Sequence, residues 1–159
     1  MKKLTLLLSV VLVVLLGIVM VFYVGGTLSA RPSVHSAAAA DYPEAYKSIR
    51  GVLDSGAAPQ VFDGAALPES PDGVSLVDVT IDLNNRGLFP AEWLDARAVP
   101  VPGDIAVYSL SGVGSDVDAR GVGQANLKLV TTADPAVQRF FEVQYYVYGM
   151  KRSLTVRVN

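Results

Sequence analysis

The sequence predicts an all-β domain, an antiparallel β-sandwich of six to seven strands, preceded by one transmembrane helix and one short helix. An uncharged apolar run occupies residues 4–24, and apolar residues at helical spacing follow within residues 43–54. From residue 74 to the end, apolar and polar residues alternate in short segments. Because no helical pattern separates those segments, they favour an antiparallel sandwich over a parallel sheet with crossover helices.

The apolar run contains no ionisable side chain other than Tyr23. At about 1.5 Å per residue, a helix of this length reaches roughly 30 Å, the thickness of the hydrocarbon core of a bilayer. Residues 1–3 form the expected cytoplasmic end, because Lys2 and Lys3 favour a cytoplasmic N-terminus. Phe22 and Tyr23 lie at the other end of the run, where aromatic residues are expected at the outer membrane interface. We therefore expect a single-pass cell-membrane protein whose body lies outside the cytoplasm.

The alternative is a cleaved secretory signal, which has a shorter apolar core of about 7 to 15 residues followed closely by small residues. Small residues occur at 28–30 and 34–37, well beyond the end of the apolar run. Cleavage near Ala37 would release a soluble secreted domain, whereas retention would leave the domain anchored.

Residues 25–41 are small, polar and without a pattern, and we expect them to form a flexible linker. The only histidine, His35, lies in this segment, so we expect it to be solvated. No catalytic triad can be built around it.

The next segment has Tyr42, Tyr46, Ile49 and Leu53 spaced by four, three and four residues, which predicts a helix over residues 43–54. We expect residues 42–73, this helix and the loop after it, to pack on the main domain. The alternative is a helix that lies on the membrane or on a partner.

The expected β-sandwich domain covers residues 74–159. The alternating segments predict strands at 74–84, 91–99, 104–110 and 124–131, a short strand near 116–119, and a closing hairpin over 139–158 that turns near Gly149. We expect four aromatic residues to help fill the core. These are Phe89, Trp93, Phe141 and Tyr145.

The segments IDLNNRG, PGDIAVYS and QANLKLV, followed by a closing hairpin, resemble the immunoglobulin-like sandwiches of bacterial cell-surface modules and of the water-stress family of late embryogenesis proteins. The resemblance covers residues 74–159. It implies an immunoglobulin-like fold and a surface role, without implying an activity. The chain has no cysteine and so lacks the cysteine pair of antibody domains.

Composition excludes several classes of function. The net charge of -2 argues against a nucleic-acid partner, which would require a basic surface. The absence of cysteine excludes disulfides, thiolate metal sites and a cysteine nucleophile. We expect no cofactor.

No convincing catalytic or metal site is predicted. Asp116 and Asp118 alternate as in a calcium loop, but no bidentate glutamate follows at the required distance. Glu92, Asp95 and Asp104 leave open the alternative of a hydrolase that uses loop carboxylates.

Tyr108, Tyr146 and Tyr148 are the candidate partner-binding residues, since aromatic side chains on an outer sheet face can form a binding patch. The alternative is that a helix or loop covers them, and the helix over residues 43–54 is the natural candidate. Three basic residues of the last hairpin are expected to protect an edge strand from pairing with other chains. These are Lys151, Arg152 and Arg157.

Taken together, these features predict a membrane-anchored, non-enzymatic module outside the cytoplasm. Its expected role is to bind another envelope protein or a surface polymer, or to serve as a small structural subunit of an envelope assembly.

Overall fold

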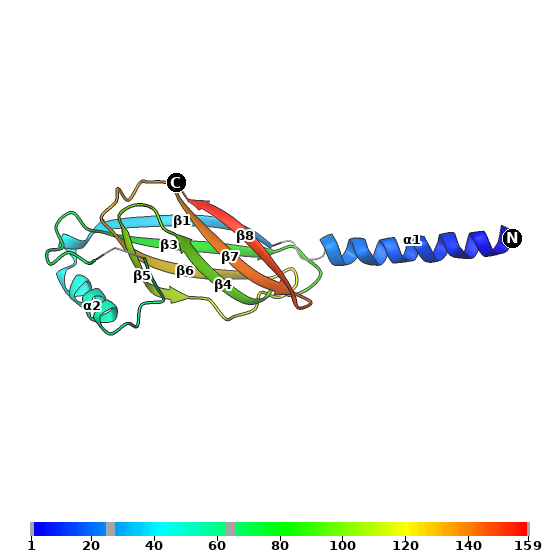
Figure 1. Ribbon diagram of the computed structural model, residues 1–159, viewed down its shortest axis with the longest axis horizontal. Coiled ribbons are helices and arrows are strands. Elements are labelled where there is room, and N and C mark those ends of the chain that lie inside the picture. Colours follow the sequence, from blue (N-terminus) through cyan, green and yellow to red (C-terminus); the bar gives the residue numbers. More distant parts are fainter. Residues whose placement is uncertain (1, 25–27, 63–65, 159) are drawn as a thin grey trace.

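The computed structural model describes residues 2–24, 28–62 and 66–158. These described residues form mostly β-structure together with two α-helices (Figure 1). The elements in chain order are α1 (Lys2–Val24), β1 (Leu28–Ala38), the 3-10 helix η1 (Ala39–Asp41), α2 (Pro43–Asp54), β2 (Gln60–Val61), β3 (Ser75–Asn85), β4 (Glu92–Val99), β5 (Asp104–Ser111), β6 (Val122–Thr131), β7 (Arg139–Val147) and β8 (Met150–Val158).

The strands form two antiparallel sheets that pack against each other. One sheet has five strands in the order β1-β3-β6-β5-β2, and the other has three in the order β4-β7-β8 (Figure 1). Every strand pairing within these sheets is antiparallel, which confirms that part of the predicted architecture.

The core lies between the sheets and is built from the alternating apolar rows. In β3 the inward residues are at most 1% exposed, because a strand turns every second side chain to the same face. The predicted rows that are buried in this way are Val77, Val79, Ile81 and Leu83 in β3, Ala125, Leu127 and Leu129 in β6, and Phe141, Val143, Tyr145 and Val147 in β7. Contacts between these rows join the two sheets.

The prediction of a flexible linker over residues 25–41 is wrong for residues 28–41, which the structure describes. Residues Leu28–Ala38 form β1, which pairs with β3 along its whole length, from Leu28 opposite Asn85 to Ala38 opposite Ser75. The sandwich therefore begins at residue 28 and not at residue 74. Strand β1 was hidden because its segment lacks alternation and contains a proline, which an edge strand tolerates since one of its sides needs no hydrogen bonds.

Trp93 was expected in the core and is 71% exposed. The pairing of β4 with β7 shifts register between Glu92 and Asp95, and Trp93 has a φ of 54° at this irregularity. Leu94 turns inward instead, so Trp93 is left on the outer side. Near the expected short strand at 116–119, a single β-bridge joins Val117 to Ala91.

Helix α2 begins and ends at the predicted residues. Its spacing buries Tyr46 and Ile49 against Ile105 of β5 and Val130 of β6, which confirms that it packs on the sandwich. The Tyr46 hydroxyl donates a hydrogen bond of 2.6 Å to the carbonyl oxygen of Pro68, and thereby ties the helix to the loop that follows it.

Helix α1 lies beyond the end of the sandwich at which β1 begins (Figure 1). Its segment Lys3–Val21 is long and apolar enough to cross a membrane, and a signal sequence has the same character. None of this segment is buried against the rest of the protein. The side chains of Phe22 and Tyr23, expected at the outer interface, lie outside the described part of the chain.

Candidate functional site

The sandwich has two ends of different character, and the register of the strands defines them. Leu28, the first residue of β1, lies opposite Asn85, and Val122, the first residue of β6, lies opposite Asn84. We call this end, with the loop 86–91, Val122 and the β7–β8 turn, the proximal end because it is next to α1. We call the opposite end, which carries α2, the distal end.

Asn85 holds the proximal end together. Its side chain is buried, and its amide nitrogen donates to the carbonyl oxygens of Phe89, Val117 and Asp118 at 2.8 to 3.1 Å. Its amide oxygen accepts a hydrogen bond from the Gly87 backbone at 2.9 Å. One side chain therefore fixes both the β3–β4 loop and the β5–β6 loop.

The β7–β8 turn reaches the same end. Tyr148 and Gly149 have φ values of 52° and 70°, which is the conformation of a two-residue turn that fits the twist of the strands. The Tyr148 and Phe89 rings meet edge to face with their centroids 4.3 Å apart. The Tyr148 ring therefore packs against Phe89, and its side chain is still 52% exposed.

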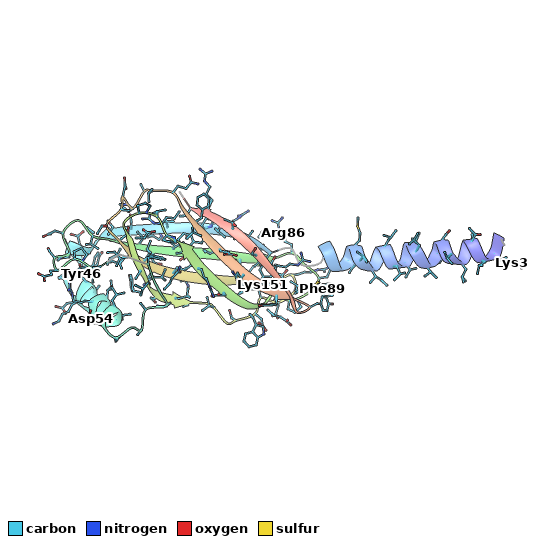
Figure 2. All side chains as sticks on the ribbon, in the orientation of Figure 1. Lys3, Tyr46, Asp54, Arg86, Phe89 and Lys151 are labelled. Carbon is cyan, nitrogen blue, oxygen red and sulfur yellow. The ribbon has the colours of Figure 1, made fainter. Side chains whose placement is uncertain are left out.

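Exposed apolar side chains gather around this end. Those between 45% and 80% exposed include Leu88, Val122, Tyr148 and Met150. Arg86 and Lys151 lie toward the same end of the sandwich as Phe89 (Figure 2). Exposed charges of both signs come from the β5–β6 loop, where Asp118 and Arg120 lie. Sequence patterns did not single out the apolar group because its members come from loops and strand termini.

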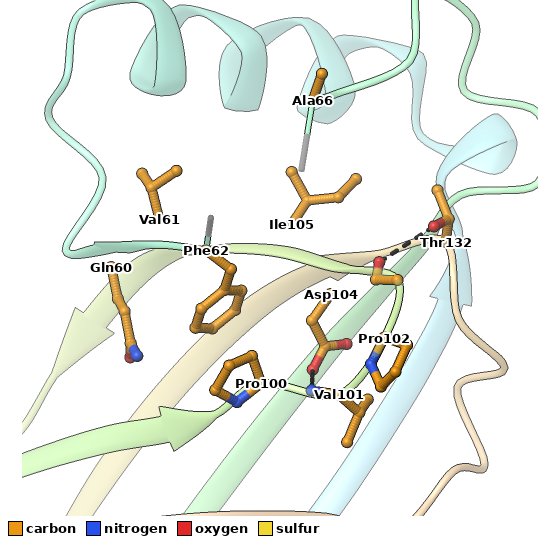
Figure 3. A pocket seen from close by; sticks show the side chains of 11 residues that line it. Gln60, Val61, Phe62, Ala66, Pro100, Val101, Pro102, Asp104, Ile105 and Thr132 are labelled. Carbon is orange, nitrogen blue, oxygen red and sulfur yellow. Dashed lines mark hydrogen bonds between the residues drawn. The ribbon is translucent and has the colours of Figure 1, made fainter. Parts of the chain in front are cut away.

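The distal end carries a pocket of about 710 Å³. Its described lining consists of Gln60, Val61, Phe62, Ala66, Pro100, Val101, Pro102, Gly103, Asp104, Ile105 and Thr132 (Figure 3). Two hydrogen bonds shape its wall: the Val101 backbone donates to the Asp104 carboxylate, and the Thr132 hydroxyl donates to the carbonyl oxygen of Gly103 (Figure 3).

Gln60 links the two sheets beside this pocket. Its amide nitrogen donates to the carbonyl oxygen of Ala98 at 2.9 Å, and its amide oxygen accepts from the Ala98 backbone nitrogen at 3.1 Å. The side chain thereby pairs with the edge of β4 much as a strand would. These two bonds join β2, at the edge of one sheet, to β4, at the edge of the other.

The structure does not bring the three candidate tyrosines together. Tyr108 lies on β5 of the five-stranded sheet, half-buried in the cluster that α2 covers, as the alternative predicted. Burial and, to a smaller extent, the nearby Asp78 carboxylate raise the Tyr108 pKa. Tyr146 lies on β7 of the other sheet and is 36% exposed, and Tyr148 lies at the proximal turn.

Three of the candidate carboxylates, those of Asp95, Asp104 and Asp116, have partners in the protein. Asp104 is buried and ion-paired with Arg139, and Asp95 pairs with Arg97 at 2.9 Å. Asp116 accepts a hydrogen bond from the backbone nitrogen of Trp93. Within the described ranges, no group of three His, Cys, Asp or Glu residues could hold a metal ion.

Strand β8, which carries Lys151, Arg152 and Arg157, is the edge strand of the three-stranded sheet. Its position agrees with the expected placement of these residues at an edge. Their role in preventing pairing with other chains stays a prediction.

Known proteins give a fold-level similarity alone. No family model matches the sequence, and no curated protein matches it at a significant level. Nineteen solved chains match, including one described as the crystal structure of the yeast GGA1_GAE domain-P21. That match has 10% identity and a TM-score of 0.41, and it covers 59% of this chain and 96% of the yeast chain.

Proposed function

We propose that the protein is a single-pass membrane protein whose sandwich stands outside the cytoplasm and binds another envelope protein through its distal end. The observation that carries the proposal is the apolar helix α1, which is unburied along Lys3–Val21 and is followed almost at once by a folded sandwich. Lys2 and Lys3 at the short end favour a cytoplasmic N-terminus.

Retention of α1 is supported by the place of the small residues that resemble cleavage sites. Both groups, at 28–30 and 34–37, lie within β1, which pairs with β3 along its whole length. Cleavage near Ala37 would remove nearly all of β1 and uncover the edge of β3. It would also remove Leu28, which is 7% exposed and belongs to the core.

The finer assignment to the immunoglobulin-like class is also a proposal. If the two-residue β2 is left aside, the remaining seven strands in chain order give one sheet of the first, second, fifth and fourth strands and another of the third, sixth and seventh. This is the strand order of the constant-type immunoglobulin sandwich. The short strand β2 pairs with the free edge of β5, which is the fourth strand in this count.

The distal end is the part that an anchored protein would present to a partner. An 11-residue strand such as β1 is about 36 Å long at about 3.3 Å per residue, which sets how far the distal end stands from the proximal one. The pocket between Phe62 and Pro102 lies at that distal end. Because Asp95 and Asp104 are each ion-paired with an arginine, the proposal includes no catalysis.

Site-specific photocrosslinking in intact cells tests this binding role. A photoreactive phenylalanine analogue replaces Val61, which is 55% exposed at the pocket, and in a matched variant it replaces Val122, which is 80% exposed at the proximal end. We expect a discrete crosslinked protein band at position 61 and none at position 122. Equal labelling at both positions, or none at position 61, would count against a distal binding site.

A further inference from the structure

Beyond anchoring by α1, we propose that the proximal end of the sandwich docks on the headgroup layer of the same bilayer, with Leu88, Tyr148 and Met150 reaching the boundary between headgroups and acyl chains. This inference rests on the proposed membrane anchoring. It adds a second contact with lipid, made by the folded domain itself.

The length of the chain brings the proximal end to the membrane. Only three residues separate Val24, the end of α1, from Leu28, the start of β1. Even fully extended, the four steps between these residues span at most about 14 Å. The headgroup layer on one side of a bilayer is about 5 to 8 Å thick. The proximal end must therefore lie at or near the lipid surface once α1 spans the membrane.

The side chains at that end suit an interface between water and lipid. Leu88 is 50% exposed, Tyr148 is 52% exposed and Met150 is 45% exposed. Tyrosine has an apolar ring and a polar tip, which is the reason that it concentrates where headgroups meet acyl chains. Single exposed apolar residues elsewhere need no such explanation, whereas this group lies at the end where the chain enters the sandwich.

The support for these side chains is rigid. Asn85 fixes the loop that carries Leu88, and the Phe89 ring packs against Tyr148. The turn conformation of Tyr148 and Gly149 holds the tyrosine outward. A preorganised surface of this kind loses little conformational entropy when it meets lipid.

The charges around this surface are mixed. Arg86, Arg120 and Lys151 are exposed there, and so are Asp116 and Asp118 of the β5–β6 loop. Binding to anionic lipid through charge would need a cluster of about four to eight Lys or Arg residues, which this mixed set does not provide. We therefore assign the contact to apolar insertion, and expect it to occur in zwitterionic and anionic bilayers alike.

Fluorescence quenching by brominated lipids tests the proposal in the full-length protein. Trp93 is the only tryptophan, so Trp93→Phe provides a silent background. Leu88→Trp then reports on the proximal end, and Tyr42→Trp, at a residue 54% exposed beside α2, is the matched distal control. Met150→Trp is a second proximal reporter in case one substitution disturbs folding.

Each variant is reconstituted into phosphatidylcholine vesicles, with or without phosphatidylglycerol, that carry bromine near the top of the acyl chains. We expect the emission of the two proximal reporters to fall at least about twofold in both lipids, because interfacial aromatic rings lie at that depth. The distal control should keep its emission. If the proximal reporters stay unquenched in protein that is inserted in the membrane, the docking proposal is overturned and the anchoring proposal is not. This result is also expected if another protein, and not lipid, covers the proximal end. Protein that washes off the vesicles in alkaline carbonate would overturn the anchoring itself.

Discussion

Arg139 and Asp104 form a buried ion pair that joins the two sheets. The Nη2 atom of Arg139, at the start of β7, lies 3.0 Å from Oδ1 of Asp104, at the start of β5, and their side chains are 3% and 0% exposed. Arg139 also donates to the carbonyl oxygens of Pro135 and Val137 at 3.1 and 3.2 Å. The charges and their hydrogen-bonding groups are therefore satisfied inside the protein.

Removal of one partner should destabilise the fold strongly. We expect Asp104→Asn to lower the free energy of unfolding by about 3 kcal/mol, because it leaves the Arg139 charge buried without its counter-ion. Urea denaturation followed by circular dichroism measures this loss. Asp95→Asn at the partly exposed Asp95–Arg97 pair is the control and should cost less than about 1 kcal/mol. Similar losses in the two variants would contradict the structural role of the buried pair.

Asn85→Ala should loosen the proximal end. The substitution leaves the Gly87 nitrogen and three carbonyl oxygens without their side-chain partner, so we expect a loss of about 2 to 3 kcal/mol in the free energy of unfolding. Hydrogen exchange of the loops at 86–91 and 117–121 should also become faster. Asn84→Ala, at the neighbouring exposed residue, should leave both measurements nearly unchanged.

Two glycine substitutions should change stability in opposite directions. Gly51→Ala in α2 has open space around the added carbon and should stabilise the protein by about 0.5 to 1 kcal/mol, because alanine favours the helix. Gly112 has a φ of 76°, and an added carbon would lie 1.9 Å from the Gln124 carbonyl oxygen. Gly112→Ala should therefore lower the melting temperature. A rise with Gly112→Ala would show that the β5–β6 loop is not held as described.

Tyr108 should make stability fall at alkaline pH. Burial and Asp78 raise its pKa in the folded protein above the ordinary value of 10.0, so the folded state holds the phenolic proton more tightly than the unfolded state does. The resulting stabilisation is complete below pH 10 and is lost as pH rises through the folded-state pKa. Denaturation between pH 9 and pH 12 should therefore show a smaller alkaline loss for Tyr108→Phe than for wild type. An identical alkaline loss in the two proteins would contradict this role of Tyr108.

The parts of the fold that the sequence predicts are those with a strong local period. The alternation of Val77, Val79 and Ile81 defined β3, and the spacing of Tyr46 and Ile49 defined α2, because burial of one face requires that pattern. Strand β1 carries no such pattern. It exists because the free edge of β3 pairs with it, and this is a tertiary effect that local composition does not reveal.

The candidate site was less predictable for a related reason. Tyr146 and Tyr108 are both tyrosines in alternating strand segments, but their strands belong to different sheets. Only the sheet topology shows this. Trp93 was placed in the core by its size, whereas a register shift turned it outward. Leu88 and Met150 lie at the same end as Tyr148 only because Asn85 and the β7–β8 turn bring separate loops there.

Cysteine accessibility in intact cells tests the membrane topology most directly, since the chain contains no cysteine of its own. Asp54→Cys places one thiol on the exposed C-terminal turn of α2, and a cysteine inserted after Met1 provides the matched control on the other side of the membrane. We predict that a membrane-impermeant maleimide labels the Asp54→Cys variant in intact cells. The labelled chain should be membrane-bound and should retain its N-terminus. The control should be labelled only after the membrane is permeabilised. Labelling of Asp54→Cys only after permeabilisation, or its release into the medium as a shortened chain, would contradict the account.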